Sequence, residues 1–200
     1  MVTNIASMEE WLIKLLLKDA LTLVFIAIAC YTDCRYGKVY NLLTFPSMGI
    51  GIVVNFAIDG INGMMRSIIG CIIGFGMFFP PFAIGWFKAG DLKFCMAVGA
   101  LKGGRIDFWN SYPFWAFLYG AAIYGVLAVA LLMRRRLGLR PFTELVRYLY
   151  YRYVMQVPVQ YQHQERNTTA PYVIGLALGC VVAMILELIW HGRVYPVIRL

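Results

Sequence analysis

Two aspartates in this chain lie where a pair of carboxyl groups could do acid–base chemistry. Asp33 follows an apolar run in the segment 31–35 (YTDCR), and Asp91 precedes another in the segment 88–93 (KAGDLK). Neighbouring carboxyl groups share a proton, because two negative charges at short range are unfavourable. The ionised group can take a proton from water, while the protonated group polarises a peptide carbonyl and then donates to the leaving nitrogen. Such a pair has the chemistry of aspartyl proteolysis.

Each aspartate alone also has a structural explanation. Asp33 would be a helix-end charge paired with Arg35, and Asp91 would be a helix N-cap. If the two do form a pair, the helix N-terminus and the charges of Lys88 and Lys93 favour the ionised form of Asp91. We therefore expect Asp91 to be the more often ionised of the two.

The composition indicates where such a pair would work. Of the 200 residues, 61% are hydrophobic and 14% are charged, with a mean hydropathy of +0.70. Soluble domains average about 45–50% apolar and about 25% charged residues, so a water-soluble core cannot hold this excess. The composition excludes a soluble globular enzyme and a disordered chain. It predicts an all-α, polytopic membrane protein with one membrane-embedded domain over residues 1–200.

The apolar segments predict the number of spans, since a helix needs about 20 apolar residues to cross a bilayer. Charged residues leave five long apolar segments, at 11–32, 39–58, 67–87, 108–133 and 167–186, and a short one at 94–101. We therefore predict about six transmembrane helices, of which the fourth is short. The 14 residues 91–104 would form only about 21 Å of helix, so one end must lie below the membrane surface. Gly90 is predicted to supply the tight turn before this helix.

Basic residues predict the orientation of the helices. The net charge is +8, and the loop 134–166 carries seven arginines. With this loop in the cytoplasm, 11 of the 18 basic residues are cytoplasmic, both termini lie outside, and Asp33 and Asp91 share the cytoplasmic side. We expect the loop to contact anionic lipid rather than nucleic acid. An apolar stripe in it predicts an interfacial helix or, alternatively, a docking surface for a partner. The stripe consists of Phe142, Leu145, Val146, Leu149 and Tyr153.

Four further acidic residues border the predicted spans. Asp19, Asp59 and Asp107 are expected to reach headgroup water. Glu187 is expected to extend out of the last span toward water, and the alternative is that it lines a cavity.

The segments around Asp33 and Asp91 resemble those of the type IV prepilin peptidases and archaeal preflagellin peptidases, which are GxGD-type intramembrane aspartyl proteases. The family's first motif, D-x-R-x-x-x-I-P-N-x-L-T, is similar to residues 33–44 (DCRYGKVYNLLT). Its second motif, G-x-G-D-x-K with a following A-x-G-A, is similar to residues 88–93 and 97–100. A later P-Y pair followed by A-L-G is similar to residues 171–172 and 177–179. The resemblance covers most of the chain, including the six-span layout.

The chain departs from the family pattern at two motif positions. Lys88 replaces the first glycine of the second motif, and Tyr40 replaces the proline of the first. The chain also has no CxxC pair and no room for the N-terminal methylating domain of full-length bacterial members. It therefore resembles the short, peptidase-only form of the family.

The resemblance implies an endopeptidase that removes the short basic leader of pilin-like or flagellin-like precursors at the cytoplasmic face of the cytoplasmic membrane. It implies Asp33 and Asp91 as the catalytic pair, and it implies neither a metal nor a cofactor. Arg35 and Lys93 are candidates for supplying charge near the site, and Asn41 is a candidate cap for the second span.

Two other functions stay open at this point. Intramembrane acids also mark proton and cation pathways, so Asp33 and Asp91 could belong to a small transporter or channel. A catalytically silent pilus-assembly subunit is compatible with the replacement at Lys88. A protease differs from both in needing the two carboxyl groups within reach of one water molecule.

Overall fold

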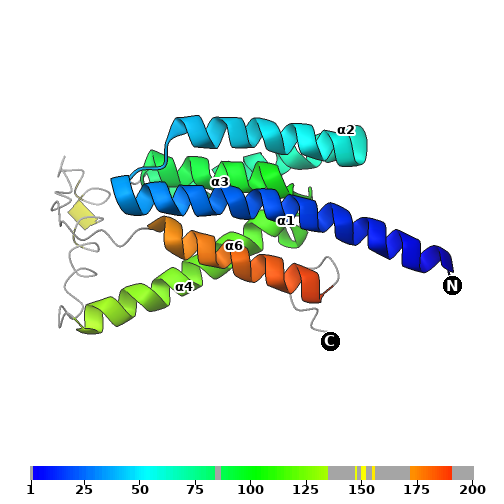
Figure 1. The fold of residues 1–200 in the computed structure, drawn as a ribbon. Helices are drawn as coiled ribbons and strands as arrows, with labels where there is room; N and C mark the ends of the chain where they lie inside the picture. The colour runs from blue at the N-terminus through cyan, green and yellow to red at the C-terminus, as the bar shows by residue number, and fades with distance from the viewer. Residues whose placement is uncertain are drawn as a thin grey trace. The chain divides into compact units, whose positions relative to one another are not determined.

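The computed structural model describes residues 2–83, 87–134, 147, 150–151, 155 and 172–190. Over these residues the chain forms helices and no strand, which confirms the all-α class for the described part (Figure 1). The elements are α1 (Val2–Tyr36), α2 (Asn41–Ala83), α3 (Ala89–Lys102), the short 3₁₀ helix η1 (Phe108–Asn110), α4 (Tyr112–Arg134) and α6 (Tyr172–Ile189). The chain divides into two compact units, Met1–Ile123 with Pro171–Leu200 and Tyr124–Ala170. Both aspartates belong to the first unit.

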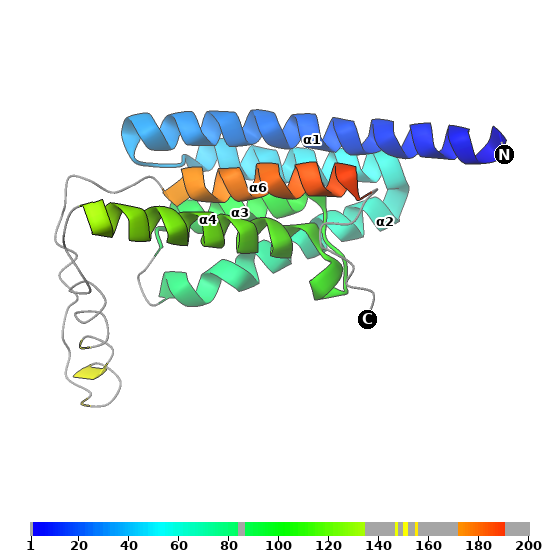
Figure 2. The same cartoon turned by 90° about the horizontal axis from the view of Figure 1, so that it is seen from below.

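The two spans predicted at 39–58 and 67–87 are the two arms of α2. The helix breaks at Gly60, whose backbone angles (φ 63°, ψ −145°) suit glycine and few other residues. Figure 2 shows the chain turning back at this point. Gly63 then lies so close to the first arm that a Cβ there would be 1.9 Å from the carbonyl oxygen of Asn55. Thus α2 is a hairpin of two antiparallel arms.

The short helix α3 lies at the centre of the first unit, and ten of its 14 residues are buried. Glycines bring the arms of α2 against its backbone, because a Cβ on Gly99 would lie 2.1 Å from the carbonyl oxygen of Gly70. Near the end of α3, the amide of Asn55 donates to the carbonyl oxygens of Ala100 and Leu101 at 3.2 and 3.0 Å. Carbonyl groups in the last turn of a helix lack intrahelical partners, so α2 satisfies them from outside.

Helices α1 and α6 also contact α3. Phe25 of α1 stacks on Phe94 of α3, with ring centroids 5.4 Å apart. The start of α4 holds α6, since the hydroxyl of Tyr112 donates to the carbonyl oxygen of Cys180 at 2.9 Å. The ends of α3 are therefore fixed by packing on several sides.

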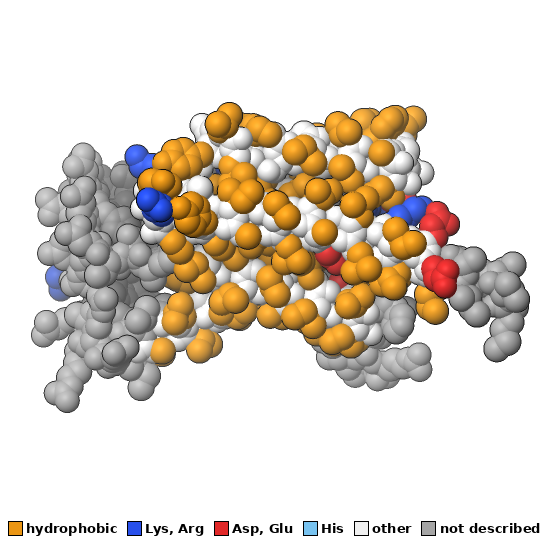
Figure 3. All heavy atoms as spheres, viewed as in Figure 1, with side chains coloured by type: hydrophobic (Ala, Val, Ile, Leu, Met, Phe, Trp, Pro, Cys, Tyr) orange, Lys and Arg blue, Asp and Glu red, His pale blue; other side chains and the backbone are white. Residues whose placement is uncertain are grey.

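Apolar side chains cover much of the outer surface of the described helices. Figure 3 shows them across the face formed by α1 and α2, while most charged side chains lie toward the ends of the helices. Strongly exposed examples are Ile13, Leu42, Val53, Ile61 and Ile72. One described helix, α2, is long and apolar enough to cross a membrane, and shorter apolar stretches run over Tyr112–Leu127 and Val173–Ile189. These helices agree with a membrane protein, while the number of six spans stays a prediction.

Three predictions concern residues outside the described part. They are the lipid contact of the loop 134–166, its apolar stripe at 142–153, and Pro171 of the P-Y pair. The predicted span at 108–133 is corrected at its start, because residues 108–110 form η1 and α4 begins at Tyr112.

Candidate active site

The structure brings Asp33 and Asp91 together at the ends of two helices. Asp33 lies in the last turn of α1, after the apolar segment 11–32, and Asp91 lies in the first turn of α3, before the segment 94–101. Both therefore lie outside the apolar stretches. The charge of Asp33 raises the pKa of Asp91, so the two carboxyl groups are close enough to interact electrostatically.

The side chain of Asp91 is held in place by the backbone just before its own helix. The backbone N–H of Lys88 donates to Asp91 Oδ2 at 3.0 Å. Asp91 is only 5% exposed, and burial raises the pKa of this carboxyl group to about 6, even though the Lys88 hydrogen bond and charge act in the opposite direction. Burial thus opposes the ionisation of Asp91 that the charges visible in the sequence favour.

Asp33 is half-buried and has different partners. Burial raises the pKa of Asp33, while the charge of Lys88 and the backbone N–H of Val173 lower it. Val173 lies in the first turn of α6, where backbone N–H groups lack intrahelical partners and favour a negative charge. The sequence predicts the last span from residue 167, whereas α6 begins at Tyr172, and the sequence does not indicate which carboxylate these N–H groups meet.

The end of α1 is fixed by a glycine just beyond Asp33. Gly37 has a positive φ of 63°, and its N–H donates to the carbonyl oxygen of Asp33 at 2.8 Å. This left-handed residue closes the last turn of the helix in the way that glycine commonly does. The chain then reaches α2 within a few residues.

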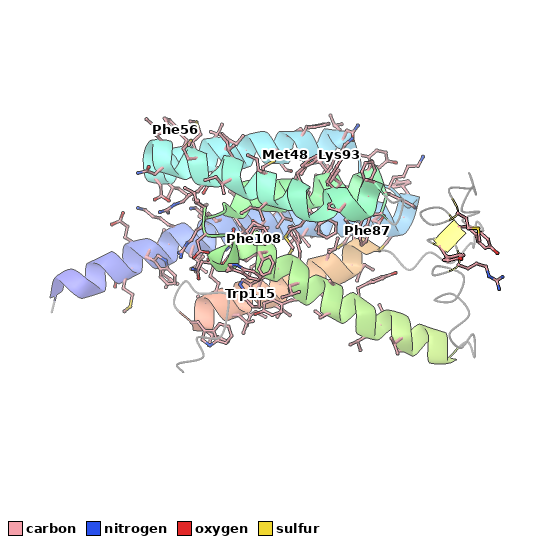
Figure 4. All side chains as sticks on the ribbon, turned by 180° about the vertical axis from the view of Figure 1, so that it is seen from behind. Met48, Phe56, Phe87, Lys93, Phe108 and Trp115 are labelled. Carbon is pink, nitrogen blue, oxygen red and sulfur yellow. The ribbon has the colours of Figure 1, made fainter. Side chains whose placement is uncertain are left out.

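Lys93 and Asn41 are brought together, but they do not face the aspartates. Lys93 Nζ donates to Asn41 Oδ1 at 2.8 Å and lies 5.4 Å from the ring centroid of Phe45. Figure 4 shows Lys93 on α3 beside the first arm of α2. Residues two apart on a helix point to different faces, which explains why Lys93 and Asp91 diverge. Asn41 is the first residue of α2, and its side-chain oxygen binds Lys93, which corrects its expected role as a cap.

Arg35 and Gly90 also differ from expectation. Arg35 donates to the hydroxyl of Tyr31 at 2.9 Å and lies 5.7 Å from the ring centroid of Tyr36, so aromatic groups hold its guanidinium. Gly90 lies inside α3 without a positive φ, so it does not supply a turn before the helix. A Cβ on Gly90 would lie 3.6 Å from Val39, which is ordinary contact.

Sequence reasoning identified Lys88 only as a departure from a motif and as a nearby charge. In the structure Lys88 precedes α3, its backbone holds Asp91, and its charge acts on both aspartates. The pair is thus surrounded by the end of α1, the start of α3 and the start of α6.

The described residues form helices with an extensive apolar surface, consistent with a membrane protein, and carry two carboxyl groups at helix ends as a candidate acid–base pair. The model of the type IV leader peptidase family matches residues 20–133, more than half of the chain, and this range includes Asp33 and Asp91. The chain belongs to the type IV leader peptidase family, and this family implies a protease. No match was found among curated proteins or among solved structures.

Proposed function

We propose that this protein is an intramembrane aspartyl endopeptidase that removes the short basic leader from type IV pilin-like or archaellin-like precursors at the cytoplasmic face of the membrane. The observation that carries the proposal is the placement of Asp33, in the last turn of α1, beside the start of α3 with Asp91 (Figure 1). Membership of the leader peptidase family supports the substrate class.

The environments of the two aspartates suggest distinct roles. Asp91 keeps its proton up to a pH of about 6, so it would polarise the carbonyl oxygen of the scissile peptide bond. Burial raises the pKa of Asp33, while the charge of Lys88 and the N–H of Val173 lower it, and in this proposal Asp33 is the group that takes a proton from the attacking water. The hydroxyl adds to the carbonyl carbon, and the proton then held by Asp33 passes to the leaving nitrogen as the C–N bond breaks.

The side of cleavage follows from the charge distribution. The loop 134–166 holds seven of the 18 basic residues, and such loops favour the cytoplasm. Alternation then gives a cytoplasmic catalytic end and both termini outside. Asn41 and Lys93 would act as supports by holding the start of α2 against α3. Arg35 and Gly90 would act as supports only at the ends of their own helices, α1 and α3.

The direct test is leader cleavage by Asp33→Asn and Asp91→Asn variants in membranes containing a pilin precursor. Each should lower the rate by about 10²–10⁴-fold, the usual contribution of a general acid or base. Asp107→Asn is the matched control, because Asp107 is exposed and bonds to Asn110 rather than to the pair. Full cleavage by either active-site variant would contradict the proposal, and inserted wild-type protein that cleaves no precursor would favour a silent assembly subunit.

A further inference from the structure

A second group of charged side chains lies at the end of α3 opposite Asp91. Lys102 Nζ lies 2.7 Å from Glu187 Oε2 of α6 and also pairs with Asp19 of α1. The Lys102 side chain is 1% exposed, and its ammonium lies 4.6 Å from the ring centroid of Tyr112. We call Asp19, Lys102 and Glu187 the Lys102 cluster.

Two of these positions correct the sequence analysis. Asp19 was expected in headgroup water, yet it is buried and bound to Lys102. For Glu187 the structure supports the alternative expectation that it lines a cavity. It lines one of about 350 Å³ together with Lys102. Replacing a buried ion pair by apolar residues is often neutral or stabilising, so stability alone does not explain the cluster. The best-attested use of such groups is to fix the register of helices.

The cluster and the candidate active site are separated along the same helices, with the cluster at the far ends of α3 and α6 and midway along α1. Along α1, Asp19 and Asp33 are 14 residues apart, which is about 21 Å of helix. Along α3, Asp91 and Lys102 are 11 residues apart, which is about 17 Å. Asp33 interacts with Asp91 while Asp19 pairs with Lys102, so the two helices run antiparallel and meet in register at both ends.

Helix α6 repeats this arrangement against α1. Val173 interacts with Asp33, and Glu187 joins Asp19 through Lys102. Val173 and Glu187 are 14 residues apart, the same spacing as Asp19 and Asp33. Each of the three helices thus carries one group of the active site at one end and one charge of the Lys102 cluster 11 to 14 residues away along the helix.

We infer that Asp19, Lys102 and Glu187 are positioning residues that fix the axial register of α1, α3 and α6 and thereby hold Asp33 against Asp91. A slip of one helical turn moves a helix by about 5.4 Å and would separate the two carboxyl groups. The effect on catalysis rests on the proposed function, whereas the effect on geometry does not.

The geometric test uses cysteines in place of the two aspartates. Asp33→Cys and Asp91→Cys are combined with replacement of Cys30, Cys34 and Cys71, which are at least partly exposed, by serine, while the fully buried Cys95 and Cys180 stay. A short bifunctional thiol reagent then reports how often positions 33 and 91 are close. Lys102→Met should lower the cross-linked fraction by at least about fivefold, since a one-turn slip exceeds the span of the reagent.

Charge exchange separates register from simple stabilisation. Asp19→Lys and Glu187→Lys with Lys102→Glu inverts all three charges, so that one carboxylate lies between two ammonium groups, and should restore cross-linking to within about twofold of the parent. Lys14→Met is the matched control, because Lys14 pairs with Glu10 on its own helix at 2.7 Å and reaches Asp59 of α2 only at 3.9 Å, and it should leave cross-linking unchanged. Unchanged cross-linking in Lys102→Met, or a loss that the exchange does not restore, overturns the inference. If Lys102→Met does not accumulate, Asp19→Asn takes its place with the same criteria.

Leader cleavage gives an independent readout in the chain with both aspartates intact. Lys102→Met should lower kcat by about 10²-fold with KM within about twofold, since misplacement of about 1 Å has this effect. The two proposals fail differently. If the parent chain cleaves no precursor but cross-linking follows the Lys102 variants, the positioning role stands and the proposed function falls. If cleavage needs both aspartates but cross-linking is unchanged in the Lys102 variants, the proposed function stands and the positioning role falls.

Discussion

The backbone N–H of Lys88 donates to the carboxylate of Asp91 at 3.0 Å, while the ammonium of the same residue acts on the charge of Asp33 as well. The hydrogen bond uses only the backbone, so any residue at position 88 could supply it. The charge requires lysine or arginine. The side chain that replaces the glycine of the family motif therefore adds an electrostatic effect to a site whose geometry the backbone already provides.

Removing this charge should shift the pH profile of leader cleavage. Lys88 lowers the pKa of both aspartates, so Lys88→Met should raise both pKa values and move the whole profile to higher pH. The shift should be less than about one unit because Lys88 is exposed. Lys88→Gly separates charge from backbone, since it should give the same shift if charge alone matters. An identical profile in wild type and Lys88→Met would contradict this.

The pH dependence of wild-type cleavage should follow the proton on Asp91. Its pKa is raised from 3.8 to about 6, so the group holds its proton at pH 5 and loses it as the pH rises through about 6. With both carboxyl groups ionised the pair lacks its acid, so kcat/KM should fall above pH of about 6. At low pH Asp33 gains a proton and the pair lacks its base. A kcat/KM that keeps rising from pH 6 to pH 8 would exclude this assignment.

The close approach of α2 and α3 predicts a strong effect of one added methyl group. A Cβ on Gly99 would lie 2.1 Å from the carbonyl oxygen of Gly70, so Gly99→Ala must push the helices apart. We expect a loss of at least about 1–3 kcal/mol in stability, seen as a lower midpoint of thermal unfolding in detergent. Gly76→Ala is the control in the same hairpin, since a Cβ there meets nothing within 4 Å. It should be neutral or stabilising by up to about 1 kcal/mol.

Cys34 offers a natural probe of the proposed orientation. It is exposed next to Asp33, whereas Cys95 and Cys180 are buried. A membrane-impermeant maleimide should therefore label Cys34 in inside-out vesicles and not in intact cells. Cys34→Ser identifies the labelled position, because Cys30 and Cys71 are only half-buried. Labelling from the outside of intact cells would place the catalytic end on the other side.

The candidate pair could be predicted from the sequence because two kinds of pattern agree on it. Asp33 and Asp91 border apolar segments, and charge counting places them on one side. The two arms of α2 were also predictable, since charged residues at Asp59 and Arg66 interrupt the apolar run. Such features depend on local composition, which the sequence displays directly.

The burial of Asp91 and the ion-pair partners of Lys102 could not be predicted from the sequence. The raised pKa of Asp91 was not predicted, because the burial of its carboxyl group arises from helices far apart in the chain. Lys102 was not singled out, since only the fold shows that Asp19 and Glu187 converge on it. A one-dimensional pattern shows which residues are charged, but the partner of each charge depends on three-dimensional packing.

The enclosure of α3 by its neighbours has a consequence for the membrane itself. Helices that face lipid must match the thickness of the hydrocarbon layer, and they tilt or distort the bilayer when they do not. With ten of its 14 residues buried, α3 is largely shielded from lipid and does not have to meet this requirement. Its length can therefore be set by the distance between its two charged ends. Changes in bilayer thickness would act on the outer helices first, and the depth of Asp91 would follow the protein rather than the lipid.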